Sequence, residues 1–240
     1  MNPSPGGDPS TGGGTLPDWL QPLASALPGV RSADLDWRED RAGPQVGARP
    51  AAVLVLLADG PAGPEVLLTE RAGSLRQHSG QVAFPGGRAD PGDASPAATA
   101  LREAAEEVGL DATGVDVLGQ LPGLQLRHSR HEVTAVVAHW RAPGPVGVVD
   151  RGEVARVESV PLAELYAPQN RCRVRAPGGY EGPAFATRGL LVWGFTAEVL
   201  VRVLRLGGLE PTPTAAASGV VGDGGPRVLG IEDALNWARS

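Results

Sequence analysis

The sequence predicts an α/β fold, and three observations lead to that prediction. Short β-rich runs recur along the chain, an amphipathic helical segment lies between the third and fourth of them, and another helical stretch follows the last. The chain has 240 residues, of which 42% are hydrophobic, so it can bury a substantial core. We therefore expect one α/β domain with additional segments at its ends.

Strands are expected where apolar and β-branched residues gather between turn residues. The expected strands are 50–59, 65–70, 82–84, 115–121, 132–140 and 154–160. Helical spacing of apolar residues predicts helices at 16–27, 96–108, 190–206 and 231–238.

The ends of the chain differ in composition from its middle. Residues 1–15 are rich in Gly, Pro and Ser and are expected to form a disordered tail. The domain is expected over 16–206, with a helical extension at its N-terminus. Residues 207–240 then hold a low-complexity loop and a short helix that packs on the domain.

Composition excludes several classes of function. The net charge of −6 disfavours a general nucleic-acid binder, which needs a basic face. No apolar run approaches the length of a membrane span, and the N-terminus has no signal-peptide pattern. Cys172 is the single cysteine, so no intrachain disulfide forms and a cytoplasmic protein is expected. The sequence does not specify an oligomeric state.

The helix expected at 96–108 has strong signals at both ends. Ser95 is a good N-cap, Pro96 suits the first turn, and Gly109 suits a left-handed C-cap. Helical periodicity predicts an apolar stripe on one side and three glutamates on the opposite side. The stripe consists of Ala97, Leu101, Ala104, Ala105 and Val108, and the glutamates are Glu103, Glu106 and Glu107.

These glutamates repel one another and lie where the helix dipole disfavours anions. Glu103 and Glu107 form an i,i+4 pair that costs ~0.2–0.5 kcal/mol, and Glu106 and Glu107 occupy the last turns. A divalent cation such as Mg²⁺ or Mn²⁺ would compensate them, because hard cations prefer carboxylate oxygens. An ordinary solvated helix face is the alternative interpretation.

The segment "FPGGRADPGDASPAATALREAAEEVGL" resembles the box of the Nudix hydrolases. The matching positions are Gly87, Arg102, Glu103, Glu106, Glu107 and Gly109. Asp93 stands where the family has its first glutamate, and eight residues rather than seven separate it from Arg102. In the family that glutamate supports the arginine, so the resemblance assigns Asp93 and Arg102 to structural support of the box.

The preceding stretch, "LLTERAGSLRQHSGQVAFPGG", resembles the additional motif of the Nudix coenzyme A pyrophosphatases. Every fixed position of that motif is filled. These positions are Leu67, Leu68, Thr69, Arg71, Ala72, Arg76, Gly80, Phe84, Pro85, Gly86 and Gly87. The later "VWGFTA" at 192–197 is similar to the same subfamily, and the whole resemblance covers roughly residues 50–206.

The resemblance implies a Nudix-type α/β/α sandwich with a central mixed β-sheet. It also implies hydrolysis of the pyrophosphate bond of coenzyme A to 3′,5′-ADP and 4′-phosphopantetheine, with Mg²⁺ or Mn²⁺ as cofactor. A Nudix hydrolase of ADP-ribose or of a dinucleoside polyphosphate is an alternative within the enzymes. A non-catalytic nucleotide-sensing module is the alternative outside them.

Roles for single residues follow from the resemblance and from their chemistry. The expected metal site is made by Glu103, Glu106, Glu107 and the carbonyl of Gly87 or Gly86. The catalytic base is either Glu103 or a later carboxylate, for which Glu153 is preferred to Glu158.

Substrate contacts are expected mainly from two arginines. Arg71 and Arg76 suit the diphosphate or the 3′-phosphate of coenzyme A, or else form structural ion pairs. Weaker candidates for substrate contact are His78, His128, His131, Trp193 and Phe195.

Overall fold

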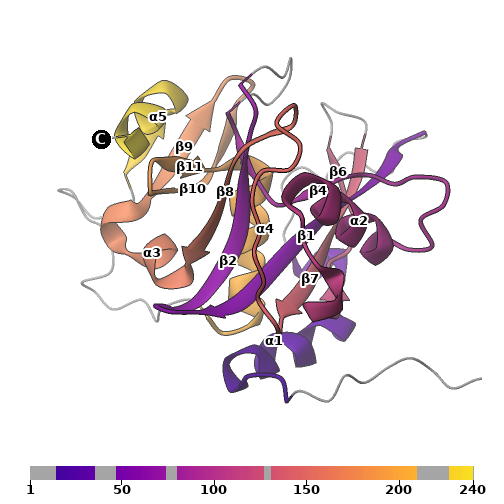
Figure 1. The fold of residues 1–240 in the computed structure, drawn as a ribbon. Helices are drawn as coiled ribbons and strands as arrows, with labels where there is room; N and C mark the ends of the chain where they lie inside the picture. Colours follow the sequence, from indigo (N-terminus) through magenta and orange to yellow (C-terminus); the bar gives the residue numbers. More distant parts are fainter. Residues whose placement is uncertain (1–14, 36–46, 74–79, 127–130, 210–226, 240) are drawn as a thin grey trace, which may run out of the picture.

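A computed structural model describes residues 15–35, 47–73, 80–126, 131–209 and 227–239 of the chain. Its main sheet has eight strands, with β3-β2-β1-β7-β5 in order, β4 paired with β1, β6 with β7, and β8 with β2 (Figure 1). The strands are β1 (Arg49–Gly60), β2 (Gly63–Arg71), β3 (Val82–Ala83), β4 (Gly86–Arg88), β5 (Val115–Gln120), β6 (Leu124–Leu126), β7 (His131–Trp140) and β8 (Val154–Pro161). Strands β1 and β7 run parallel and the other pairs are antiparallel, so the predicted mixed sheet is confirmed.

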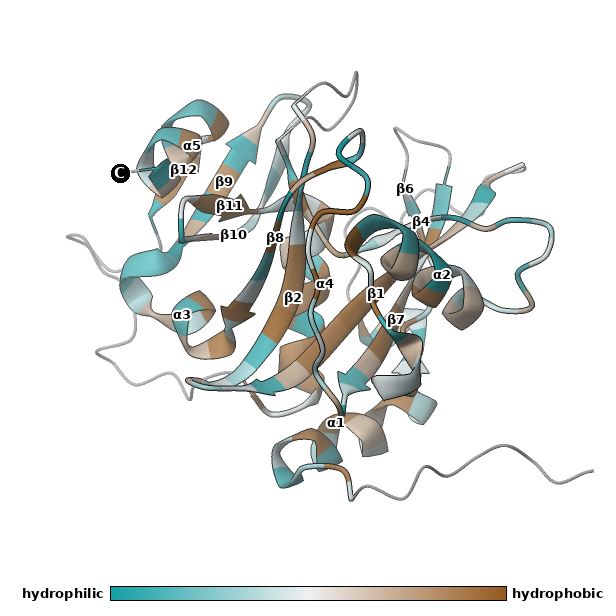
Figure 2. Cartoon of the chain, viewed as in Figure 1, coloured by the Kyte–Doolittle hydropathy of each residue, from teal (hydrophilic) through white to brown (hydrophobic). Residues whose placement is uncertain are grey.

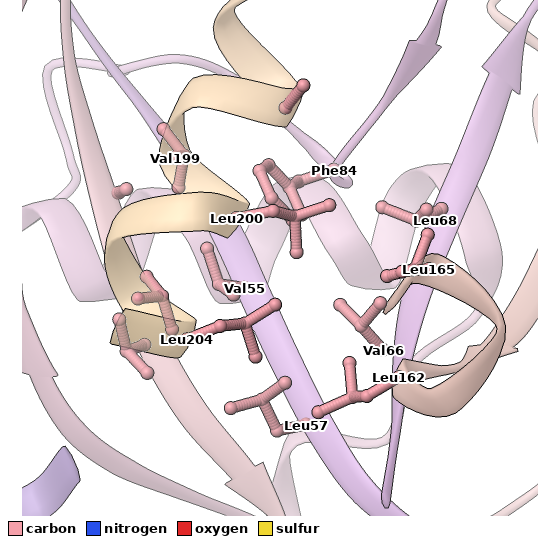
Figure 3. Packing of buried hydrophobic residues seen from close by; sticks show 14 of the residues in the cluster. Val55, Leu57, Val66, Leu68, Phe84, Leu162, Leu165, Val199, Leu200 and Leu204 are labelled. Atoms are coloured by element: carbon pink, nitrogen blue, oxygen red, sulfur yellow. The ribbon is translucent and has the colours of Figure 1, made fainter. Parts of the chain in front are cut away.

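Helices cover both faces of this sheet. Helix α2 (Pro96–Val108) packs on one face against alternate β1 residues such as Leu54 and Leu56. The other face carries α1 (Gln21–Ala26), α3 (Leu162–Tyr166) and α4 (Gly194–Leu206). Figure 3 shows Val55 and Leu57 of β1 facing residues of α3 and α4. The predicted α/β/α arrangement is therefore confirmed.

Burial on both faces explains the nearly continuous apolar run of β1. Residues 54–58 of this strand are all buried, and successive side chains point to opposite faces. Figure 2 shows this hydrophobic stretch of β1 in brown, between the covering helices. None of the helices in the described ranges is long and apolar enough to span a bilayer.

A second, four-stranded sheet was not predicted. Its order is β11-β10-β9-β12, and it consists of β9 (Arg171–Ala176), β10 (Tyr180–Thr187), β11 (Leu190–Val192) and β12 (Val228–Gly230). Helix α5 (Ile231–Arg239) packs on it through Ala234, so the predicted terminal helix is confirmed.

The predicted helix over 190–206 is corrected at its start: residues 190–192 pair with β10 and the helix begins at Gly194. A short apolar run fits a strand or a helix equally well, and the pairing partner decides between them.

The N-terminal helix is shorter than predicted. Only Gln21–Ala26 is α-helical, and short 3₁₀ turns, Asp18–Leu20 and Leu27–Gly29, lie on either side of it. The tail at 1–14 and the loop at 210–226 fall outside the described residues, so those expectations stay predictions.

Helix α2 has the predicted ends but a different buried face. The Ser95 hydroxyl accepts a hydrogen bond from the Ala98 N–H at 3.2 Å, and Gly109 is left-handed with a φ of 72°. Ala105, predicted to be in the apolar stripe, is exposed, whereas Glu107, predicted on the opposite side, is buried. Glu107 follows the buried Ala100 by seven residues, almost two helical turns, so the two share a face.

Replacing the N-cap should weaken this helix measurably. Ser95→Ala removes the acceptor for the Ala98 N–H, and we expect the free energy of unfolding to fall by about 1 kcal/mol. Urea denaturation would measure this change, and Ser95→Asp, which keeps an acceptor, should preserve most of the stability. Equal stability of the alanine variant and the wild type would contradict the capping role.

Candidate active site

Two glycines of β4 allow the sheet and α2 to approach closely. Gly86 and Gly87 pair with Val53 and Ala52 of β1. A Cβ atom on Gly86 would lie 2.4 Å from the Ala52 carbonyl oxygen, and one on Gly87 would lie 2.5 Å from the Glu103 carboxyl group. The Glu103 carboxylate therefore lies directly against the backbone of Gly87.

Glu107 is a buried carboxylate held by the same strand. Its side chain accepts a hydrogen bond from the Gly86 N–H at 3.0 Å, and only 4% of the residue is exposed. Burial raises the pKa of Glu107 to about 7, and the negative charges of Glu103 and Glu153 act in the same direction. The Gly86 N–H and the positive charge of Arg71 oppose this rise. Burial also raises the pKa of Glu103, while Arg102 opposes that rise.

Arg102 connects α2 to the loop before it. Its guanidinium donates to both Asp93 carboxylate oxygens at 3.1 and 3.0 Å, and to the Arg88 carbonyl oxygen at 2.9 Å. It also donates to Glu103 at 3.2 Å. This bidentate pair holds the pKa of Asp93 well below its usual range. The structure thus pairs Asp93 with Arg102 despite the shorter side chain and the extra loop residue.

Glu106 is the most exposed of the three box glutamates. Its side chain is 60% exposed and pairs with Arg102 at 3.0 Å. Within the described part of the chain, no three His, Cys, Asp or Glu side chains gather closely enough to hold a metal ion. The negative charge of Glu106 nevertheless raises the pKa of Glu103, so Glu106 lies within electrostatic reach of the Glu103–Glu107 pair.

The loop before β8 brings Glu153 to the box. The N–H groups of Gly147 and Val149 donate to the Val108 and Glu107 carbonyl oxygens, both at 3.0 Å, and so bind the loop to the end of α2. The Glu153 carbonyl oxygen then accepts from the Ala72 N–H at 2.8 Å. These contacts were not predicted, because the Gly- and Pro-rich sequence of the loop carries no signal for them.

Glu158, the weaker candidate for the base, is engaged elsewhere. Its carboxylate pairs with Arg156 at 2.8 Å and with Arg188 at 3.7 Å. Glu153, by contrast, lies close enough to Glu103 and Glu107 for its charge to raise both of their pKa values.

Arg71 lies at an irregularity in the pairing of β2 with β8. The register shifts between Glu70 and Arg71, and such a bulge re-aims the side chains beside it. The positive charge of Arg71 lowers the pKa of Glu107, yet its buried Nε atom has no hydrogen-bond partner among the described residues. Arg71 therefore has free hydrogen-bonding capacity beside the carboxylate pair.

The remaining candidates are either outside the described residues or packed elsewhere in the fold. Arg76, His78 and His128 fall outside the described residues. Trp193 makes an edge contact with Tyr180, with ring centroids 6.0 Å apart, and packs on the second sheet, while Phe195 packs against the main core. Both aromatic side chains therefore pack against hydrophobic clusters of the fold.

Comparison with known proteins identifies the family of the chain. The NUDIX domain family matches residues 48–177, which is more than half of the chain. The chain belongs to the Nudix family.

Two relatives, each an uncharacterized Nudix hydrolase named NudL, come from Yersinia pestis and Yersinia pseudotuberculosis. Each is 49% identical over 116 residues, which cover 48% of this chain and 57% of the relative. The match thus spans little more than half the length of these relatives.

Solved Nudix structures are similar over part of the chain. A C. elegans Ap4A hydrolase binary complex has 23% identity and a TM-score of 0.40, and the match covers 47% of this chain and 80% of that one. The NUDIX domain of Shewanella oneidensis NrtR, complexed with ADP ribose, has 22% identity and a TM-score of 0.39, with 56% and 85% covered.

Proposed function

We propose that this Nudix protein hydrolyses the pyrophosphate bond of coenzyme A and its derivatives to 3′,5′-ADP and 4′-phosphopantetheine. The observation that carries a catalytic function is the buried carboxylate of Glu107, placed beside Glu103 and within electrostatic reach of Arg71. The coenzyme A assignment is supported by the filled motif over residues 67–87. We place the reaction in the cytoplasm, which suits the single, unpaired Cys172.

The donor set fits a hard divalent cation. Glu107 forms no ion pair with any residue in the described ranges, and burial leaves its charge poorly solvated. Nudix hydrolases generally use divalent ions, and Mg²⁺ or Mn²⁺ would be held here by Glu103, Glu107 and the carbonyl of Gly87. When bound, the ion supplies charge neutralisation for the phosphate oxygens and lowers the pKa of a water molecule. Glu106 pairs with Arg102 through one carboxylate oxygen, and its other oxygen is the one that would join the ion.

Side chains of the protein bind the diphosphate, position Glu103 and accept a proton. Arg71 binds the diphosphate through charge-assisted hydrogen bonds, because it lies near Glu107 with an unused donor. The Asp93–Arg102 pair holds Glu103 against Gly87. Glu153 accepts the proton of the attacking water, with Glu103 as the alternative base.

Product analysis on a substrate panel tests this proposal. Coenzyme A, dephospho-coenzyme A, ADP-ribose and a dinucleoside tetraphosphate are incubated with the full chain, with and without Mg²⁺ or Mn²⁺. We expect coenzyme A to have the highest kcat/KM and no turnover without metal. Preference for ADP-ribose or the tetraphosphate would overturn the substrate assignment. Nucleotide binding without turnover of any compound would favour the sensing alternative.

Removing Arg71 should weaken hydrolysis of coenzyme A and of dephospho-coenzyme A alike. If Arg71 binds the diphosphate, Arg71→Ala loses a charge-assisted interaction of ~1.5–3 kcal/mol, which corresponds to a fall of ~10- to 150-fold in kcat/KM. Arg239→Ala, far along the chain in α5, is the matched control and should change neither value. A loss confined to coenzyme A would instead assign Arg71 to the 3′-phosphate.

A further inference from the structure

Arg49, Arg88 and His131 lie on neighbouring strands at one end of the main sheet. Arg49 begins β1, His131 begins β7 and Arg88 ends β4 (Figure 1). The parallel register pairs Arg49 with His131, and the antiparallel register pairs Arg88 with Ala51, two residues after Arg49. Residues paired across strands share a face, as do residues two apart along a strand. The three side chains, called the strand-end basic cluster, therefore leave the same face.

The two arginines of this cluster have no acidic partner. Both are exposed, and neither forms an ion pair or a side-chain hydrogen bond with the residues that the structure describes. Other arginines, such as Arg173 and Arg188, are paired with carboxylates. An unpaired group of like charges is unexpected in a chain with a net charge of −6, in which carboxylates are plentiful.

His131 adds an unused polar atom to the same place. Its Nε2 atom is buried and has no hydrogen-bond partner in the part of the chain that the structure describes, which costs free energy unless a ligand supplies one. Burial lowers the pKa of His131, and the positive charges of Arg88 and Arg49 lower it further. The adjacent Glu132 points to the other face of β7, where its carboxylate lies beside Gly123. The charges that His131 experiences from its neighbours are thus positive.

The cluster is connected to the proposed active site through β4. Arg88 follows Gly87, the residue against which the Glu103 carboxylate lies, and the Arg88 carbonyl oxygen accepts from Arg102. The Arg88 side chain leaves the opposite face of the strand, at its exposed end. The carboxylate pair and the cluster therefore lie at successive residues of β4, on its two faces.

We propose that the strand-end basic cluster binds the phosphomonoester dianion of the substrate, which in coenzyme A is the 3′-phosphate. This inference rests on the proposed function and extends it. Two guanidinium groups suit a dianion because each can donate two parallel hydrogen bonds to phosphate oxygens. Arg71, which lies beside Glu107, is thereby left for the diphosphate.

Binding of the reaction products to the full chain, without metal, tests the inference. Isothermal titration calorimetry compares adenosine 3′,5′-bisphosphate with adenosine 5′-monophosphate, which differ by the 3′-phosphate alone. We expect the wild type to bind the bisphosphate at least ~10-fold more tightly, as two charge-assisted contacts imply. The ratio of the two affinities should fall to about one in the double variant Arg49→Gln/Arg88→Gln. It should keep its wild-type value in the control variant Arg239→Gln. Because each ratio compares two ligands on one protein, partial loss of folded material does not affect it.

Three results would overturn the inference. The first is equal affinity of the wild type for the two nucleotides, and the second is an unchanged ratio in the double variant. The third is binding of inorganic phosphate as tight as that of the bisphosphate, which would assign the cluster to free phosphate. Hydrolysis is not part of this measurement. If coenzyme A is hydrolysed but the affinity ratio is unchanged in the double variant, only the phosphate-binding role of the cluster is refuted. If the affinity ratios are as expected but coenzyme A is not hydrolysed, only the proposed activity is refuted.

Discussion

Glu107→Gln should lower turnover of coenzyme A at least ~100-fold while leaving the fold intact, because metal-assisted steps supply several kcal/mol. The substitution removes the charge that would hold the metal but keeps the shape of the side chain. The glutamine carbonyl can still accept the hydrogen bond from the Gly86 N–H. Steady-state kinetics at saturating Mg²⁺ measures the loss, and Glu232→Gln in α5 is the control. Near-normal turnover would reject the assignment of Glu107.

The same variant should be more stable than the wild type when metal is absent and the pH is high. Burial raises the pKa of Glu107 from 4.5 to about 7, so the folded protein retains a proton that the unfolded chain releases. The free energy of unfolding of the wild type therefore declines as the pH rises from about 4.5 to about 7, whereas the variant lacks this decline.

Thermal melts in a chelating buffer at pH 5 and pH 8 measure this difference in stability. We expect the variant's Tm to exceed that of the wild type at pH 8, and the gap to shrink at pH 5. Addition of Mg²⁺ should raise the Tm of the wild type more than that of the variant, since a ligand of the folded state alone stabilises it. A gap of equal size at both pH values would show that charge burial at Glu107 is not its cause.

Gly87→Ala should reduce turnover by about 10- to 100-fold, since displacing a catalytic group by about 1 Å can have such an effect. The new Cβ atom would lie 2.5 Å from the Glu103 carboxyl group, which must move away from the strand. Gly87 has no left-handed backbone, so the substitution acts through this contact and not through backbone strain.

Gly92→Ala is the matched control for this variant. A Cβ atom at Gly92 meets nothing within 4 Å, and its backbone is not left-handed either. Turnover of Gly92→Ala should equal that of the wild type, and thermal melts would show that both variants fold. Full activity of Gly87→Ala would mean that Glu103 does not need to lie against this strand. Gly86→Ala is a poorer probe, because its Cβ would clash with the Ala52 carbonyl and destabilise the sheet.

Features that depend on local interactions could be predicted from the amino-acid sequence. The ends of α2 were predicted correctly because the Ser95 cap and the left-handed Gly109 act within one turn of the helix. Strand β1 was predicted because a strand buried on both faces must be apolar throughout. The box identified the Nudix family because it is one continuous stretch of chain. The substrate and the roles of the site residues stay predictions.

The tertiary structure alone decided how these pieces form a site. Glu107 is buried because β4 packs against α2, and Glu153 approaches the box because Gly147 and Val149 bind the end of that helix. The strand at 190–192 exists because β10 is available to pair with it. Arg49, Arg88 and His131 are distant in sequence and meet through the register of three strands. Such contacts depend on which distant segment supplies the partner, and local propensity carries no information about that choice.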